Sequence, residues 1–132
     1  MSILRIPLTA GLFLALPLAA LADPQSECSV DATSQIEIGT CLETAARLAD
    51  ATVQSALEFA LQSAQELDDV TGRKSSVPAL TTAQAGWEAY RTAHCDFVGT
   101  TYGGGSGTGI AIQSCRIALA RARADDLMRY VQ

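Results

Sequence analysis

The stretch PALTTAQAGWEAYRTAHCDFVGTT, residues 78–101, decides the fold. A stripe of mostly apolar residues recurs in it in alternating steps of three and four: Leu80, Ala83, Trp87, Tyr90, His94, Phe97 and Thr101. That spacing is typical of a helix that packs along other helices. It predicts a helix with Pro78 in its opening turn, ending near the glycines that follow residue 101.

A longer helix is predicted before this stretch, from about Thr33 to Asp69. The segment has no proline, has Gly39 as its only glycine, and is rich in strong helix formers. Its apolar stripe is Leu42, Ala45, Ala49, Val53, Ala56, Ala60, Ala64 and Leu67. Asp31 or Thr33 would cap its start, and Gly72 would close its end. We expect its N-terminal third to project or bend, since this helix is longer than the other two predicted helices.

A third helix is predicted after the glycines, capped by Ser106 or Thr108. Its inward positions are Ile112, Cys115, Leu119, Arg123, Leu127 and Tyr130, with the stem of Arg123 lying along the stripe. No segment alternates with the period of a strand. The sequence therefore predicts an all-α, antiparallel three-helix bundle with one long N-terminal helix, preceded by an irregular segment over residues 23–35.

Residues 1–22 are predicted to be a cleaved signal peptide. Arg5 precedes the uncharged run IPLTAGLFLALPLAALA, which ends in the small-x-small pattern of a signal peptidase site. The run is short for a membrane span and contains two prolines. We expect one exported helical domain, residues 23–132, that is periplasmic or secreted and has no membrane segment after cleavage.

The chain is acidic, with 9 basic and 14 acidic residues and a net charge of −5. This balance disfavours nucleic acid and anionic lipid as partners. It is compatible with a basic protein partner, and equally with plain solubility. The sequence leaves the oligomeric state open.

Four cysteines, Cys28, Cys41, Cys95 and Cys115, all lie in the exported part. An even number in a small exported chain indicates two disulfides. Three pairings are possible, and we favour the local one, Cys28 with Cys41 and Cys95 with Cys115. Each bridge would then close a short segment, and the second would enclose the glycine-rich stretch.

No catalytic group or cofactor site is predicted. The single histidine, His94, lies in an apolar stripe, where a packed histidine is commoner than a general base. The pairs Asp68-Asp69 and Asp125-Asp126 lie near helix ends, where solvated charge is usual. No CxxC occurs, and His94 directly precedes Cys95, which is poor spacing for zinc ligands. We expect no enzyme activity, no cofactor and no metal.

The glycine-rich stretch TYGGGSGTG, residues 101–109, is not a phosphate loop. Such a loop follows a strand and carries a lysine, whereas here helices flank the glycines and the chain's only lysine is Lys74. The pattern favours a helix–helix connection in which glycines supply positive φ angles. A disulfide around its base would hold it as a stiff, protruding tip that suits insertion into a partner.

Three groups of residues together resemble the LprI-type lysozyme inhibitor domain. They are Gln84-x-x-Trp87-x-x-Tyr90-Arg91-x-x-x-Cys95, then Tyr102-x-Gly104-Gly105-Ser106, then Cys115 followed by Arg121-x-Arg123 and Leu127. The resemblance covers essentially all of residues 23–132. It implies a small bacterial envelope protein that blocks a lysozyme-like muramidase by binding it. The alternative is an envelope interaction or scaffold module with another protein partner.

The resemblance also implies roles for single residues. Trp87 and Tyr90 are expected in the core, and Arg91, one step off the stripe, is expected to pair with Asp50 of the first helix. The candidates for partner contact are the exposed loop residues Tyr102, Gly104, Gly105 and Ser106. We expect a loop hydroxyl to hydrogen-bond a carboxylate in the lysozyme cleft.

Overall fold

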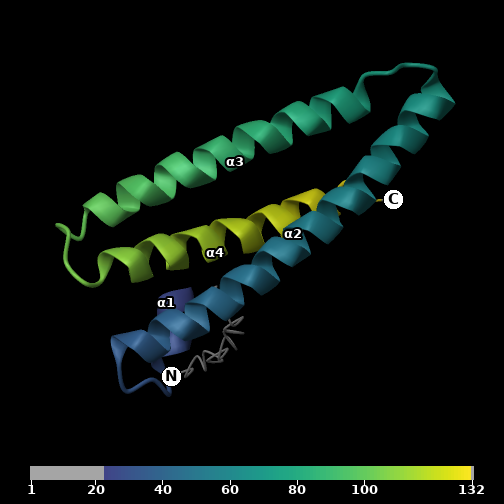
Figure 1. The fold of residues 1–132 in the computed structure, drawn as a ribbon. Coiled ribbons are helices and arrows are strands. Elements are labelled where there is room, and N and C mark those ends of the chain that lie inside the picture. Colours follow the sequence, from purple (N-terminus) through teal and green to yellow (C-terminus); the bar gives the residue numbers. More distant parts are fainter. Residues whose placement is uncertain (1–22, 132) are drawn as a thin grey trace, which may run out of the picture.

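Three long helices and one short one make up the structure, a computed structural model that describes residues 23–131 (Figure 1). They are α1 (Pro24–Ser29), α2 (Gln35–Thr71), α3 (Ser76–Thr100) and α4 (Thr108–Met128), and no strand occurs in this part of the chain. The helix α3 runs antiparallel to α2 and α4, which are parallel to each other. The predicted all-α bundle with a long N-terminal helix is confirmed. The predicted signal peptide, residues 1–22, lies outside the described residues.

The hydrophobic core lies mainly between α2 and α4. Its α2 side consists of Leu42, Ala49, Val53, Ala56 and Ala60, and its α4 side of Ile117, Ala120, Ala124 and Leu127. Alanines make up three of the five residues on the α2 side and two of the four on the α4 side, so the two helix axes can approach closely. The stripe predicted for α2 is confirmed over most of its length, but Leu67 at its C-terminal end is exposed.

The start of α2 is fixed by a reciprocal cap. The hydroxyl of Ser34 accepts a hydrogen bond from the Glu37 amide at 3.3 Å, and the Glu37 carboxylate accepts from the Thr33 amide at 2.6 Å. The arrangement resembles a capping box, except that Glu37 reaches the amide of Thr33, the residue before the N-cap, and not the amide of Ser34. The N-cap is therefore Ser34 and not Asp31 or Thr33. At the other end Gly72 has φ +67° and closes α2, as predicted.

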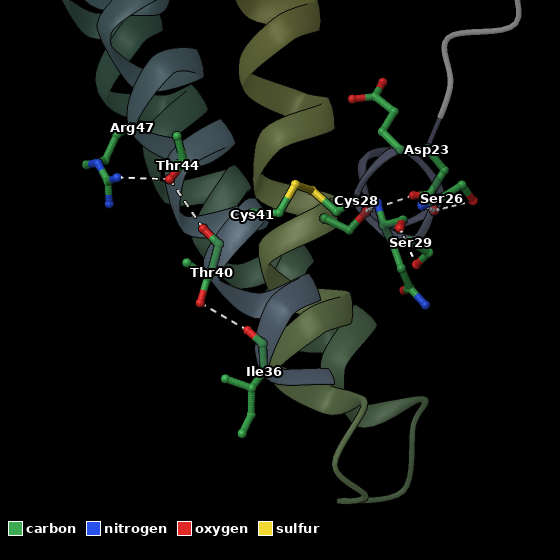
Figure 2. The surroundings of a disulfide bond; sticks show 12 residues. Asp23, Ser26, Cys28, Ser29, Ile36, Thr40, Cys41, Thr44 and Arg47 are labelled. Carbon is green, nitrogen blue, oxygen red and sulfur yellow. Dashed lines mark hydrogen bonds between the residues drawn. A yellow bond between two sulfur atoms is a disulfide. The ribbon is translucent and has the colours of Figure 1, made fainter. Parts of the chain in front are cut away.

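The short helix α1 was not predicted, because its six residues carry no period that a sequence pattern can show. It is held by side-chain contacts. The Cys28–Cys41 disulfide joins it to α2 (Figure 2), and Glu27 forms an ion pair with Arg121 of α4 at 2.7 Å. With α1 docked here, the N-terminal third of α2 neither projects nor bends as expected, and Leu42 is fully buried.

Asp68 joins the end of α2 to the start of α3. Its buried carboxylate accepts hydrogen bonds from the amides of Ser75, Ser76 and Val77 at 2.8–3.2 Å. These amides belong to the first turn of α3, whose own N-cap residue makes no side-chain cap. The expectation that Asp68 is a solvated surface charge is wrong, because the α3 amides need an acceptor and the turn brings Asp68 to them.

Replacing Asp68 by alanine should lower the melting temperature by roughly 5 °C near neutral pH, because the first turn of α3 loses its only carboxylate cap. Burial would raise the pKa of Asp68, but the Ser76, Val77 and Ser75 amides outweigh it and lower the pKa from 3.8 to about 2. A carboxyl whose pKa is lowered by folding stabilises above its unfolded pKa. The difference between wild type and variant should therefore shrink as pH falls from about 4 to about 2.

Thermal melts followed by circular dichroism across this pH range measure the effect. Asp69→Ala is the matched control, because Asp69 is exposed and accepts a hydrogen bond from Gln65 of its own helix. Equal melting temperatures for the two variants at neutral pH would show that the Asp68 cap does not stabilise the turn.

The inward face of α3 is rotated relative to the predicted stripe. Tyr90 and Phe97 are 53% and 63% exposed, and Ala83 and Thr101 are also exposed. The buried positions are instead Gln84, Cys95 and Gly99. The cause is the second disulfide, because Cys95 must face Cys115 of α4 to form it. The residues one and three turns before Cys95 on the same face are Arg91 and Gln84, so these polar side chains point inward.

The helix α4 lies between all the others and is buried over a wide face. Its buried positions are Ala111, Ser114, Ile117, Ala120, Ala124 and Leu127. The predicted positions Ile112, Cys115, Leu119 and Arg123 are half-buried, and Tyr130 is exposed. Leu127 lies in the core as predicted. The prediction otherwise identified one edge of this helix and missed most of the core face, because small residues such as Ala120 and Ala124 carry little hydrophobic signal.

Candidate functional site

The candidate site is the glycine loop, residues 101–107, which connects α3 to α4 at one end of the bundle. Two of its glycines, Gly103 and Gly104, have φ of +65° and +80°, which disfavours any other residue there. Consecutive tight turns close the loop. The amide of Tyr102 donates to the Gly99 carbonyl at 3.1 Å, and that of Thr108 donates to the Gly105 carbonyl at 3.0 Å. These hydrogen bonds give the loop a defined conformation.

The base of the loop is formed by Gly99 and the first turns of α4. A Cβ at Gly99 would lie 2.7 Å from Cδ1 of Ile112, so glycine allows α3 and α4 to approach closely here. The Cys95–Cys115 disulfide encloses the loop, as predicted, but lies further along the two helices. Neither Ser106 nor Thr108 caps α4, whose N-cap is Gly107 with no side-chain hydrogen bond. Backbone turns replace the side-chain cap that we expected.

The four loop residues expected to contact a partner lie together on the tip. Tyr102, Gly104, Gly105 and Ser106 are all exposed. The Tyr102 ring is 49% exposed and rests on Gly107, with 3.4 Å between its Cδ1 and the position of a Cβ there. Gly107 therefore leaves space for the ring beside the loop.

The start of α2 extends this surface. A small hollow of about 300 Å³ lies between the loop and α2, and its walls include Ser106, Ile110 and Gln113 together with Gln35, Ile36 and Gly39. Ile36 is 82% exposed at its edge. Figure 2 shows its side chain projecting from the first turn of α2. Sequence reasoning missed Ile36, because nothing in the sequence shows that the first turn of α2 lies beside the loop.

Below the loop, the motif residues on α3 form a cluster around the Trp87 ring. The guanidinium carbon of Arg91 lies 5.3 Å from the ring centroid and that of Arg123 lies 6.0 Å from it. Such cation–π contacts are favourable, more so where water is excluded. Arg123 also donates from Nε to the side-chain oxygen of Gln84 at 3.1 Å and from Nη1 to Asp126 at 2.9 Å.

Arg91 ties three helices together. From α3 its Nη2 donates to Asp50 of α2 at 2.7 Å, and its Nε donates to the backbone carbonyl of Arg116 in α4 at 3.1 Å. The pairing of Arg91 with Asp50 is the one expected from the sequence. Because Arg91 is mostly buried by these contacts, its geometry is that of an interhelical clamp and not of a surface that meets a partner.

His94 lies beside Tyr90, with ring centroids 5.2 Å apart and the planes 18° from parallel. It is half-buried, whereas Tyr90 is exposed. The expectation that Tyr90 belongs to the core is therefore wrong, because the rotation of α3 places it on the solvent side. Within residues 23–131, no group of three or more His, Cys, Asp or Glu side chains is arranged to hold a metal ion.

The family comparison covers this whole arrangement. A family model described as Lysozyme inhibitor LprI matches residues 26–127. The chain belongs to the LprI family. The matched residues include both disulfides, the Trp87 cluster and the glycine loop. No curated protein and no solved structure gives a significant match.

Membership of the LprI family carries a coarse functional statement. It is a family of lysozyme inhibitors and not of enzymes, which implies an inhibitory role and a protein partner. Lysozyme inhibitors act outside the cytoplasm, and two disulfides are compatible with that setting. Across residues 23–131, no helix is both long and apolar enough to cross a membrane.

Proposed function

We propose that this chain is exported and blocks a lysozyme-like muramidase by inserting the glycine loop into its cleft. The observation that supports this most is the loop itself. In a chain of an inhibitor family, it is an exposed, internally hydrogen-bonded tip built on a close α3–α4 contact. A tip that is already ordered loses little conformational entropy on binding.

Occlusion would need no chemistry from this chain. Lysozymes cleave glycosidic bonds with a pair of carboxyl groups on either side of the bond. The loop offers the hydroxyls of Tyr102 and Ser106, which can donate to such carboxyls, and glycines that keep the tip narrow enough to enter a cleft. The partner contacts are assigned to Tyr102, Gly104, Gly105 and Ser106, with Ile36 at the edge.

Export rests on the signal peptide predicted for residues 1–22. Cleavage after Ala22 would leave Asp23 as the first residue, and Asp23 already has a structural role. Its carboxylate accepts from the Ser114 hydroxyl of α4 at 2.7 Å and from the Ser26 amide in α1 at 3.1 Å. The Ser114 hydroxyl is the main cause of the lowered pKa of Asp23. The first residue of the proposed mature chain, Asp23, would thus already make a tertiary contact, with Ser114 of α4.

Binding to a basic lysozyme should weaken as salt is added. The chain has a net charge of −5, so opposite charges would steer the two proteins together, and salt screens that attraction. Biolayer interferometry with immobilised lysozyme, over a series from low to several hundred millimolar sodium chloride, should show a falling association rate and a nearly constant dissociation rate. An association rate that does not change with salt would contradict electrostatic steering. No binding at any salt concentration would contradict the proposed function.

A further inference from the structure

An open apolar groove lies at the opposite end of the bundle from the glycine loop. Its cavity measures about 700 Å³, and its walls include Ala60, Ala64 and Leu67 of α2, Leu80 and Ala83 of α3, and Tyr130 after α4. We call this the hairpin groove. Val70 at its edge is 87% exposed, and Leu67 and Tyr130 are more than half exposed.

The hairpin groove exists because α4 is shorter than the α2–α3 hairpin. Along most of the bundle α4 fills the space between α2 and α3, but it ends at Met128, short of the turn between them (Figure 1). The remaining two helices have no third helix against them. The Asp68 carboxylate holds the turn through the Ser76 and Val77 amides, so the two walls keep their spacing without an occupant.

The charges at the groove differ from those of the whole chain. The chain has 14 acidic and 9 basic residues, so two copies repel each other over most of their surface. The charged residues that line the groove are two acids, Glu66 and Asp126, and two bases, Arg123 and Arg129. This is a neutral patch where a second copy is not repelled.

Within the described part of one copy, residues 23–131, two of these charges form no ion pair. Arg123 and Asp126 pair with each other at 2.9 Å. Glu66 of α2 and Arg129 after α4 form no ion pair with any residue of 23–131, and Glu66 only accepts from Gln62 of its own helix at 3.0 Å. In a two-fold arrangement, Glu66 of one copy can meet Arg129 of the other, twice over.

We propose that two copies of this chain pair through the hairpin groove, with the α2–α3 hairpin of each covering the groove of the other. The result is a four-helix layer around an apolar seam. The small side chains of Ala64 and Ala83 let the helices of the two copies approach closely. In one copy the glycine loop lies at the opposite end of the bundle from the α2–α3 turn (Figure 1), so both loops of the dimer would remain open to a partner.

Sedimentation equilibrium of the purified, processed protein tests the pairing over low to several hundred micromolar chain. The average mass should rise towards that of a dimer with concentration. Ala83→Glu should raise the dimer dissociation constant at least tenfold, because a charge would enter the apolar seam. Ala85→Glu is the matched control: it is exposed on the same helix two residues away and does not line the groove.

A charge exchange tests the two-fold contact itself. Glu66→Arg should weaken pairing, since it places like charges opposite Arg129, and Glu66→Arg with Arg129→Glu should restore it. A constant monomer mass, or a dimer unaffected by Ala83→Glu, would overturn the proposal. A monomer whose groove takes up dansyl-undecanoic acid, with Ala83→Glu abolishing that uptake, would also overturn it and indicate an apolar ligand.

Because the loops are remote from the groove, the Ala83→Glu monomer should bind lysozyme as the wild type does. This result separates the pairing proposal from the inhibitory function.

Discussion

Replacing both Cys95 and Cys115 by alanine should lower the free energy of unfolding by about 3 kcal/mol, the usual effect of a bridge that closes a loop of this length. The bridge spans 20 residues and joins α3 to α4. The helix α3 depends on it, because its buried residues are only Gln84, Cys95 and Gly99, and its larger apolar residues Leu80 and Trp87 are half-buried. Without the disulfide, hydrophobic packing would therefore hold α3 only weakly against the other helices.

Urea denaturation followed by circular dichroism gives the free energy of unfolding of this variant. The matched comparison is Cys28→Ala with Cys41→Ala, which removes a bridge across 13 residues. That bridge holds α1, so its loss should speed hydrogen exchange in α1 and leave exchange in α3 unchanged. If losing Cys95–Cys115 changes stability no more than losing Cys28–Cys41 does, α3 is held by other contacts.

Replacing Tyr102 and Ser106 by alanine together should weaken lysozyme inhibition by roughly tenfold or more, since interface tyrosines are frequent hot spots. The melting temperature should change little, because both side chains are exposed and the Ser106 side chain makes no hydrogen bond within residues 23–131. Inhibition constants from a turbidity assay, measured beside thermal melts, separate contact with the partner from folding.

Matched controls for this variant lie elsewhere on the same molecule. Tyr90→Ala and Ser55→Ala remove the same side chains from exposed positions outside the loop, Tyr90 on α3 and Ser55 on α2. They should leave inhibition unchanged. If the loop variant inhibits as strongly as these controls, the loop does not contact the enzyme. If it loses its fold, the loop residues are structural.

The helical class and the disulfides could be predicted from the sequence, but the inward face of α3 could not be read from its apolar residues. Tyr90 and Phe97 have the spacing of a core stripe, yet they are exposed. The cysteines are the better indicator of which face of α3 points inward. Once Cys95 is expected to bridge to α4, its face must point inward, and Arg91 and Gln84 share that face by helical spacing. Covalent constraint outweighed apolar periodicity here.

Asp68 shows a second limit of sequence reasoning. An Asp-Asp pair near a helix end is usually solvated, and its neighbour Asp69 is exposed as expected. What buries Asp68 is the geometry of the turn, which returns the chain so that three amides of α3 point at one carboxylate. That geometry depends on the direction in which α3 leaves α2, which a local pattern does not contain.

The candidate site could also be predicted from the sequence only in part. The loop could be found from its composition, because five glycines in nine residues, 101–109, are unusual. Its neighbourhood could not be found, since the approach of Ile36 and Gln35 to Ser106 depends on how α2 lies against α4. The hairpin groove is also invisible in the sequence, because it follows from where α4 ends relative to the α2–α3 turn.

The most direct test of the proposed function is a titration of the purified, processed protein into lysozyme acting on bacterial cell walls. Chicken-, goose- and invertebrate-type enzymes should be assayed in parallel, because the loop geometry alone does not select among them. We predict saturable inhibition of at least one type, with an end point at one chain per enzyme. Full activity of all three types at micromolar excess of this protein would contradict it.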